Sequence, residues 1–172
     1  NPDQADTSGN GIGDACEVPS LSLRVAKLTD RAKANGDTWV ATGELDATST
    51  SDFLSAIDSG GLNVQLRNAT THALIHVATF TGAECDRVTR TQGSIRCKNA
   101  DGSRVSLAKR SATEFFKFSI RVGKAQVASG LVGPDTEPLQ VVITNPVGRA
   151  RGDDSNTCTQ RGKGTIVTRS EE

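Results

Sequence analysis

Apolar and polar residues alternate along most of this chain of 172 residues. The run from Phe115 to Val122 shows the pattern most clearly, because an apolar residue stands at every second position from Phe116 onward. A period of two residues is typical of antiparallel strands that bury one face of their sheet. Gly, Asn, Asp or Pro, which favour turns, separate the runs. The pattern predicts eight or nine strands, at Ser20–Leu28, Thr38–Leu45, Leu62–Arg67, Ala73–Phe80, Ser94–Lys98, Arg104–Lys109, Phe115–Val122, Leu139–Thr144 and Gly164–Thr168.

One short segment, Asp52–Ser59, has apolar residues at helical spacing instead. Helices of this length are unstable in water by themselves, so we expect a turn or a single helical turn there.

The strand pattern predicts an all-β protein. Eight or nine antiparallel strands at this spacing favour a β-sandwich of immunoglobulin-like kind, formed by residues 20–172. The Cys–Trp–Cys arrangement of antibody domains is not reproduced, so the prediction concerns the architecture and not membership of that family. Trp39 is in phase with Ala41 and Leu45, and we expect it in the core.

The first 19 residues lie outside the strand pattern and form a separate predicted unit. Within it, Asp6–Glu17 has the spacing of a twelve-residue calcium loop, with Gly11 at the sharp turn. Alternate residues of such a loop point their oxygen atoms inward, and Ile12 serves through its backbone carbonyl. The alternative is an Asp- and Gly-rich linker that holds no ion. The predicted calcium ligands are Asp6, Ser8, Asn10, Ile12, Asp14 and Glu17.

The segment NPDQADTSGNGIGDACE, residues 1–17, resembles a thrombospondin type 3 repeat, from the NPDQ lead-in to the Cys after the last Asp. Pro19 argues against the exit helix of an EF-hand, which makes the repeat the better match. In that family the repeats are extracellular, bind calcium and carry disulfides, and the resemblance implies the same here. Ser8 and Asn10 stand where the family usually has Asp. Fewer carboxylates imply weaker binding, toward a dissociation constant of ~10⁻⁴–10⁻³ M.

The four cysteines are expected to form disulfides, because their number is even and none belongs to a C-x-x-C pair. Cys85 and Cys97 flank a short segment with TQGS in its middle, as a hairpin would place them, so we pair these two. Cys16 and Cys158 then either pair with each other or find partners on segments outside this sequence. In the repeat family the equivalent of Cys16 often pairs with a neighbouring repeat.

The net charge is zero, which argues against nucleic acid as a main partner. The charge is nevertheless uneven: residues 1–60 hold ten acids and four bases, whereas residues 86–124 hold ten bases and three acids. The basic stretch is either a solvated face of a sheet or a binding surface for an anionic polysaccharide or nucleic acid. If the two regions occupy different faces of the sandwich, head-to-tail contact between copies brings opposite charges together.

Catalytic chemistry is not expected from this sequence. No nucleophile-elbow, P-loop or Rossmann pattern occurs. The only two histidines, His72 and His76, would lie about 13 Å apart on a strand, too far to share a metal ion. No apolar run approaches the ~18 residues of a membrane span. Two short motifs remain: an RGD triplet, Arg151–Asp153, in an expected exposed loop, and a glycosylation sequon at Asn68.

These features together predict a non-enzymatic, secreted or cell-surface structural module stabilised by calcium. It would act as a stalk domain or as a self-assembling subunit of a filament or surface layer. Its expected partners are further copies of itself, in head-to-tail contact, or neighbouring domains, because a chain that begins at Asn1 reads as a processed product or a fragment. The alternative is an adhesive or carbohydrate-binding module.

Overall fold

A computed structural model of the protein describes residues 20–29, 36–47, 53–88, 93–110, 115–125, 139–146, 148–153, 159–160 and 165–169. The predicted N-terminal unit, residues 1–19, lies outside this described part. Within the described part of the chain, each of the nine predicted strands is present. Three further strands, β5, β10 and β11, were not predicted. The strands are β1 (Ser20–Thr29), β2 (Asp37–Asp46), β3 (Leu62–Asn68), β4 (Leu74–Phe80), β5 (Cys85–Arg87), β6 (Ser94–Lys98), β7 (Arg104–Lys109), β8 (Phe115–Ala125), β9 (Leu139–Asn145), β10 (Gly148–Asp153), β11 (Thr159–Gln160) and β12 (Thr165–Arg169).

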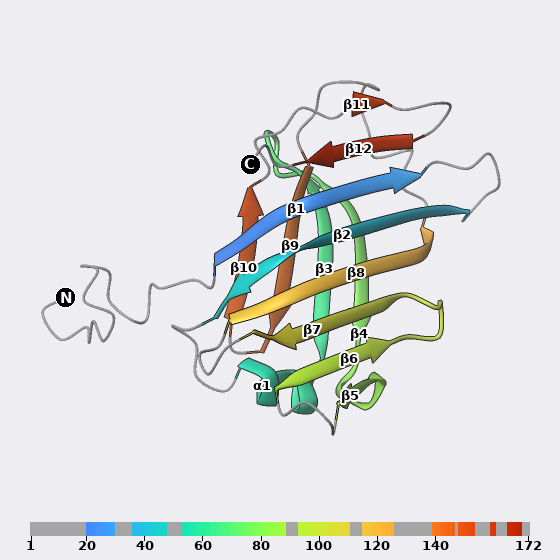
Figure 1. Ribbon diagram of the computed structural model, residues 1–172. Coiled ribbons are helices and arrows are strands. Elements are labelled where there is room, and N and C mark those ends of the chain that lie inside the picture. Colours follow the sequence, from blue (N-terminus) through green and yellow to red (C-terminus); the bar gives the residue numbers. More distant parts are fainter. Residues whose placement is uncertain are drawn as a thin grey trace, which may run out of the picture.

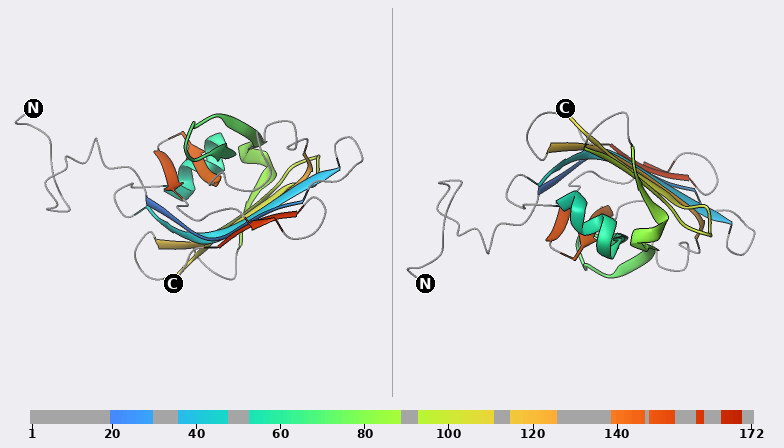
Figure 2. Two further views of the ribbon diagram at one scale, coloured as in Figure 1. Left: turned by 90° about the horizontal axis from the view of Figure 1, so that it is seen from above. Right: turned by 90° about the horizontal axis from the view of Figure 1, so that it is seen from below.

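The strands form two antiparallel sheets that face each other as a sandwich (Figures 1 and 2). The first sheet has the order β5-β6-β7-β8-β2-β1, and β12 continues it beyond β1. The second sheet has the order β4-β3-β9-β10. β1 joins the two, because its first residue pairs in parallel with β10 while its second half pairs with β12. In Figure 1 the strands of the second sheet cross those of the first steeply.

The core lies between the sheets and is built by the predicted alternation. In the central pair β2 and β8, Trp39 lies opposite Val122 and Leu45 lies opposite Phe116, and all four side chains are buried. Trp39 is 1% exposed, which confirms its predicted place in the core. Gly43 allows the close packing here, since a Cβ atom would lie 2.0 Å from the carbonyl oxygen of Ser22.

The segment expected to be a turn or a single helical turn is an α-helix of eight residues, α1 (Phe53–Gly60). The expectation underestimated the length of the helix because it considered the segment in isolation, whereas packing against the sandwich stabilises it. Phe53 and Ile57 are fully buried, and the ring of Phe53 lies 6.2 Å from that of Phe116. The side-chain amide of Asn145 donates a hydrogen bond of 2.8 Å to the carbonyl oxygen of Phe53. α1 therefore covers one end of the core (Figure 1).

The Cys85–Cys97 disulfide is present, as predicted. The two residues lie directly opposite each other in the pair β5–β6, with their Cα atoms 4.0 Å apart. Both side chains are buried. The bond holds β5, a strand of only three residues, against the sheet. The other predicted pair, Cys16 and Cys158, lies outside the described residues.

Candidate functional site

Four cationic side chains share the outer face of the first sheet. Arg96 and Lys98 lie on β6, Arg104 on β7 and Arg121 on β8, and each is exposed. Side chains alternate between the two faces along each of the three strands, so the residues next to these cations in each strand face the core. The buried residues next to the cations along the strands are Ile95, Cys97, Val105, Ile120 and Val122.

The pairing register brings three of these cations into one row across the strands. Lys98 lies directly opposite Arg104, and Arg104 lies directly opposite Arg121. Residues opposite each other in an antiparallel pair have Cβ atoms about 4.5–5.5 Å apart, and like charges at such positions are destabilising. The fold therefore places positive charges together at a cost in stability.

A second row of side chains lies two residues along each strand from the first, and it is mostly uncharged and polar. Arg96 lies opposite Ser106, Ser106 opposite Ser119, and Ser119 opposite Thr42 on β2. Hydroxyl groups both donate and accept hydrogen bonds. Two serine hydroxyls therefore lie beside the cationic row.

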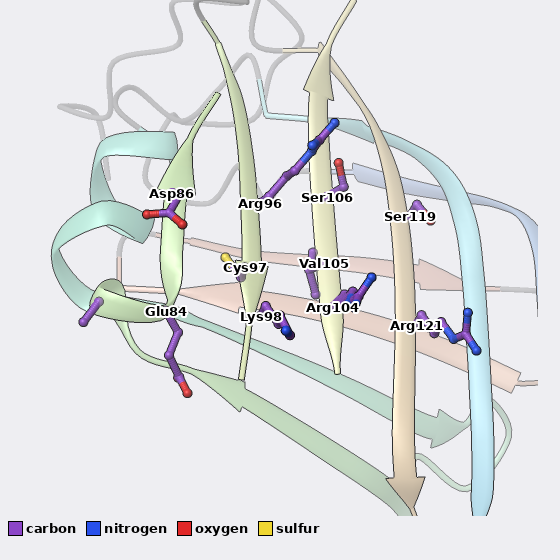
Figure 3. A pocket seen from close by; sticks show the side chains of 11 residues that line it. Glu84, Asp86, Arg96, Cys97, Lys98, Arg104, Val105, Ser106, Ser119 and Arg121 are labelled. Carbon is purple, nitrogen blue, oxygen red and sulfur yellow. The ribbon is translucent and has the colours of Figure 1, made fainter. Parts of the chain in front are cut away.

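These side chains surround a hollow of about 850 Å³ on the surface of the sheet. Figure 3 shows Arg96, Lys98, Arg104 and Arg121 on one side, with Glu84 and Asp86 at the edge formed by β5 and the 3-10 turn Gly82–Glu84. We call this site the basic hollow. Its polar lining consists of Glu84, Asp86, Arg96, Lys98, Arg104, Ser106, Ser119 and Arg121.

None of the four cations is in an ion pair with a described residue, although Asp86 lies directly opposite Arg96 in the pair β5–β6. The ion pair described there joins Arg87 to Asp58 at 2.6 Å and lies outside the basic hollow. Glu84 is already engaged, since its carboxylate accepts hydrogen bonds of 2.8 Å from the backbone N–H and 3.1 Å from the hydroxyl of Thr81. The row Lys98, Arg104 and Arg121 thus presents positive charge to solvent, whereas Asp86 offsets part of the charge of Arg96.

The calcium ligands predicted from the sequence, Asp6, Ser8, Asn10, Ile12, Asp14 and Glu17, lie outside the described residues. Among the residues that are described, no group of three or more His, Cys, Asp or Glu side chains is placed to hold a metal ion. The calcium site therefore stays a prediction.

The two histidines lie in different kinds of local structure, one in a turn and one on a strand. His72 is in the turn between β3 and β4, with a φ of 58°. His76 is on β4 and accepts a hydrogen bond of 3.4 Å from the indole N–H of Trp39 through its Nδ1 atom. Burial lowers the pKa of His76 below its ordinary value of 6.5. This contact links the two sheets of the sandwich.

Two short motifs are placed differently from what their sequence suggests. Arg151–Asp153 belongs to β10 and pairs with β9, so the expected exposed loop is wrong for the RGD triplet. The sequon residue Asn68 is 5% exposed, and its Oδ1 atom accepts hydrogen bonds from the N–H groups of Thr70 and Thr71, each 2.8 Å long. A glycan on Asn68 would require this turn to open.

The sequence predicted only part of the basic hollow. The excess of bases in residues 86–124 pointed to these strands, and the alternation placed the bases on one face. No local sequence pattern predicts the register between β6, β7 and β8, which aligns three cations.

No protein-family model, no curated protein and no solved structure matches this chain. Among the described residues, none of the helices has the length and apolar character needed to cross a membrane.

Proposed function

We propose that this protein is a non-enzymatic extracellular structural module, a β-sandwich whose N-terminal loop is stabilised by calcium. The observation that carries the proposal is the ligand spacing of Asp6–Glu17, set in a segment that resembles a thrombospondin type 3 repeat. The Cys85–Cys97 disulfide supports it, because such bonds persist in oxidising compartments. The immunoglobulin-like kind of sandwich remains a prediction. The steep crossing in Figure 1 differs from the aligned packing usual in that fold.

Calorimetry with calcium tests the loop. Asp6→Ala and Asp14→Ala should each weaken binding strongly, because each removes a charged oxygen ligand. Asp101→Ala removes one carboxylate from an exposed turn and is the matched control. Binding should also weaken in acid, since the ligands must be ionised. Undiminished calcium affinity in both loop variants would contradict the proposal.

Within this function, we propose that copies of the chain associate. Charge-driven head-to-tail contact requires the acidic and the basic region to occupy different faces of the sandwich. The described strands do not meet this condition, because β1 and β2 lie in the same sheet as β5–β8. The surface that supports assembly is β4, which ends the second sheet and exposes Leu74 (50%) and Val77 (42%). An edge strand with exposed apolar residues can accept a strand from a neighbouring chain.

Light scattering with calcium and with a chelator tests association. Val77→Lys should reduce the assembled mass, because a lysine on an edge strand opposes pairing. Ser22→Lys, on an exposed position of β1, is the control. A monomer under every condition, with Val77→Lys behaving as the parent chain, would leave the function of a stalk domain between neighbouring domains of a longer chain.

A second candidate function, an adhesive or carbohydrate-binding module, is favoured by the basic hollow. Three of its cations, Lys98, Arg104 and Arg121, lie opposite one another and are in no ion pair with a described residue, which supports an anionic ligand.

A further inference from the structure

We infer that the basic hollow binds an anionic polysaccharide, with sulfate or carboxylate groups on the cationic row Lys98, Arg104 and Arg121 and with sugar hydroxyls on Ser106, Ser119 and Asp86. This inference rests on the second candidate function and names its ligand class. It is independent of the calcium loop.

The first step concerns charge. Arg104 lies between Lys98 and Arg121 in the register, so three positive charges follow one another on adjacent strands. Adjacent strands lie about 4.8 Å apart, so the row extends for about 10 Å. A ligand that carries several negative charges along its length can contact all three, and a single small anion cannot. Arginine adds geometric fit, because its planar guanidinium binds carboxylate and sulfate-like groups through two parallel hydrogen bonds.

The second step concerns shape. A hollow of about 850 Å³ falls within the range of ~300–1,000 Å³ typical of ligand sites. It lies on the open outer face of the sheet, where a chain can pass across β6, β7 and β8 (Figure 3).

The third step distinguishes a sugar polymer from a nucleic acid. Proteins bind single-stranded nucleic acid by stacking bases on aromatic side chains, and no Phe or Trp lines the basic hollow. Asp86 borders it, and its carboxylate can accept hydrogen bonds from the hydroxyl groups of a sugar. Ser106 and Ser119 add neutral partners beside the cations. Charge together with hydroxyl recognition fits an acidic or sulfated polysaccharide best.

Binding measurements on the full chain test the inference, with dextran sulfate and polygalacturonate as probes. Uncharged dextran and a thymidine oligonucleotide serve as comparison ligands. Affinity for both anionic polymers should fall as salt is raised from 0.05 to 0.5 M, because salt screens exposed charges. The double variant Arg104→Gln/Arg121→Gln should lose at least about tenfold in affinity, since two charge-assisted contacts are removed.

The matched control is Lys27→Gln/Lys117→Gln. It removes the same charge from exposed positions of the same sheet, on β1 and β8, but outside the basic hollow. Its affinity should change less than about threefold, because neither lysine lines the basic hollow. Thermal unfolding of both double variants shows that each is folded.

Four results would overturn the inference: no binding of either anionic polymer, an equal loss in the control, tighter binding of the oligonucleotide, or an oligomer that only the basic-hollow variant dissociates. The last result would make a second copy of the chain the occupant. Each leaves calcium binding at the N-terminal loop unaffected, so failure here is distinguishable from failure of the proposed module.

Discussion

Replacing Arg104 by Gln should make the protein more stable, because Arg104 is flanked by two like charges. Its direct neighbours across the strands are Lys98 and Arg121. If the charged groups are taken to be about 7 Å apart in water, each pair costs about 0.6 kcal/mol. Both pairs together cost about 1 kcal/mol at 0.01 M salt, where screening is slight. The cost falls to about 0.5 kcal/mol at 0.15 M and to nearly zero at 1 M, because the screening length shortens to about 3 Å.

Lys117→Gln is the matched control, because the sign of its effect is opposite. Lys117 is on the same face of β8, but its cross-strand neighbours are Glu44 and Ala108. Removing it loses one favourable pair and should destabilise the fold by about 0.5 kcal/mol at 0.01 M salt. Both Arg104 and Lys117 are exposed on strands of the same sheet, so differences in burial and strand propensity are small.

Urea unfolding at 0.01, 0.15 and 1 M NaCl measures these effects through the fluorescence of Trp39, the only Trp in the chain. The free energy of unfolding should rise in Arg104→Gln and fall in Lys117→Gln at low salt, and the two should converge at 1 M. If Arg104→Gln is less stable than the parent at low salt, or if its effect does not depend on salt, then the cationic row carries no electrostatic cost. The argument that the fold maintains this row for a ligand would then lose its basis.

Two further predictions concern the core and the disulfide. Burial lowers the pKa of His76, so the unfolded chain takes up a proton below pH 6.5 while the folded protein resists it. The free energy of unfolding should therefore be highest above pH 6.5 and fall as the pH drops through the lowered pKa, and His76→Gln should reduce this dependence in urea titrations. The double variant Cys85→Ala/Cys97→Ala should lose about 3 kcal/mol of stability, because the disulfide closes a thirteen-residue loop. Peptide mapping without reductant should recover the two cysteine peptides linked, and free thiols at both positions in protein from its native compartment would exclude the bond.

The alternation of apolar and polar residues was sufficient to predict the nine principal strands and the buried Trp39. This is because a period of two residues assigns each side chain to the core or to solvent without reference to the rest of the chain. The same local logic paired Cys85 with Cys97, since a hairpin brings its two ends together. The calcium loop is a local pattern too, and its ligands come from twelve consecutive residues.

Contacts between distant segments decided the remaining features. α1 is a helix because Phe53 and Ile57 have a core to enter, and Asn145, 92 residues from Phe53, donates to its first turn. β10 has no apolar alternation and is a strand because β9 offers a partner along its length. β5 has three residues, too few for any pattern.

The cationic row depends on tertiary structure most of all. The sequence shows Lys98, Arg104 and Arg121 as separate bases on three strands, and only pairing in register places them opposite one another. A shift of one residue in either pair would face alternate side chains to the core and break the row. The composition of the strands is therefore a local property, whereas the electrostatic field of their outer face arises only when the sheet is assembled.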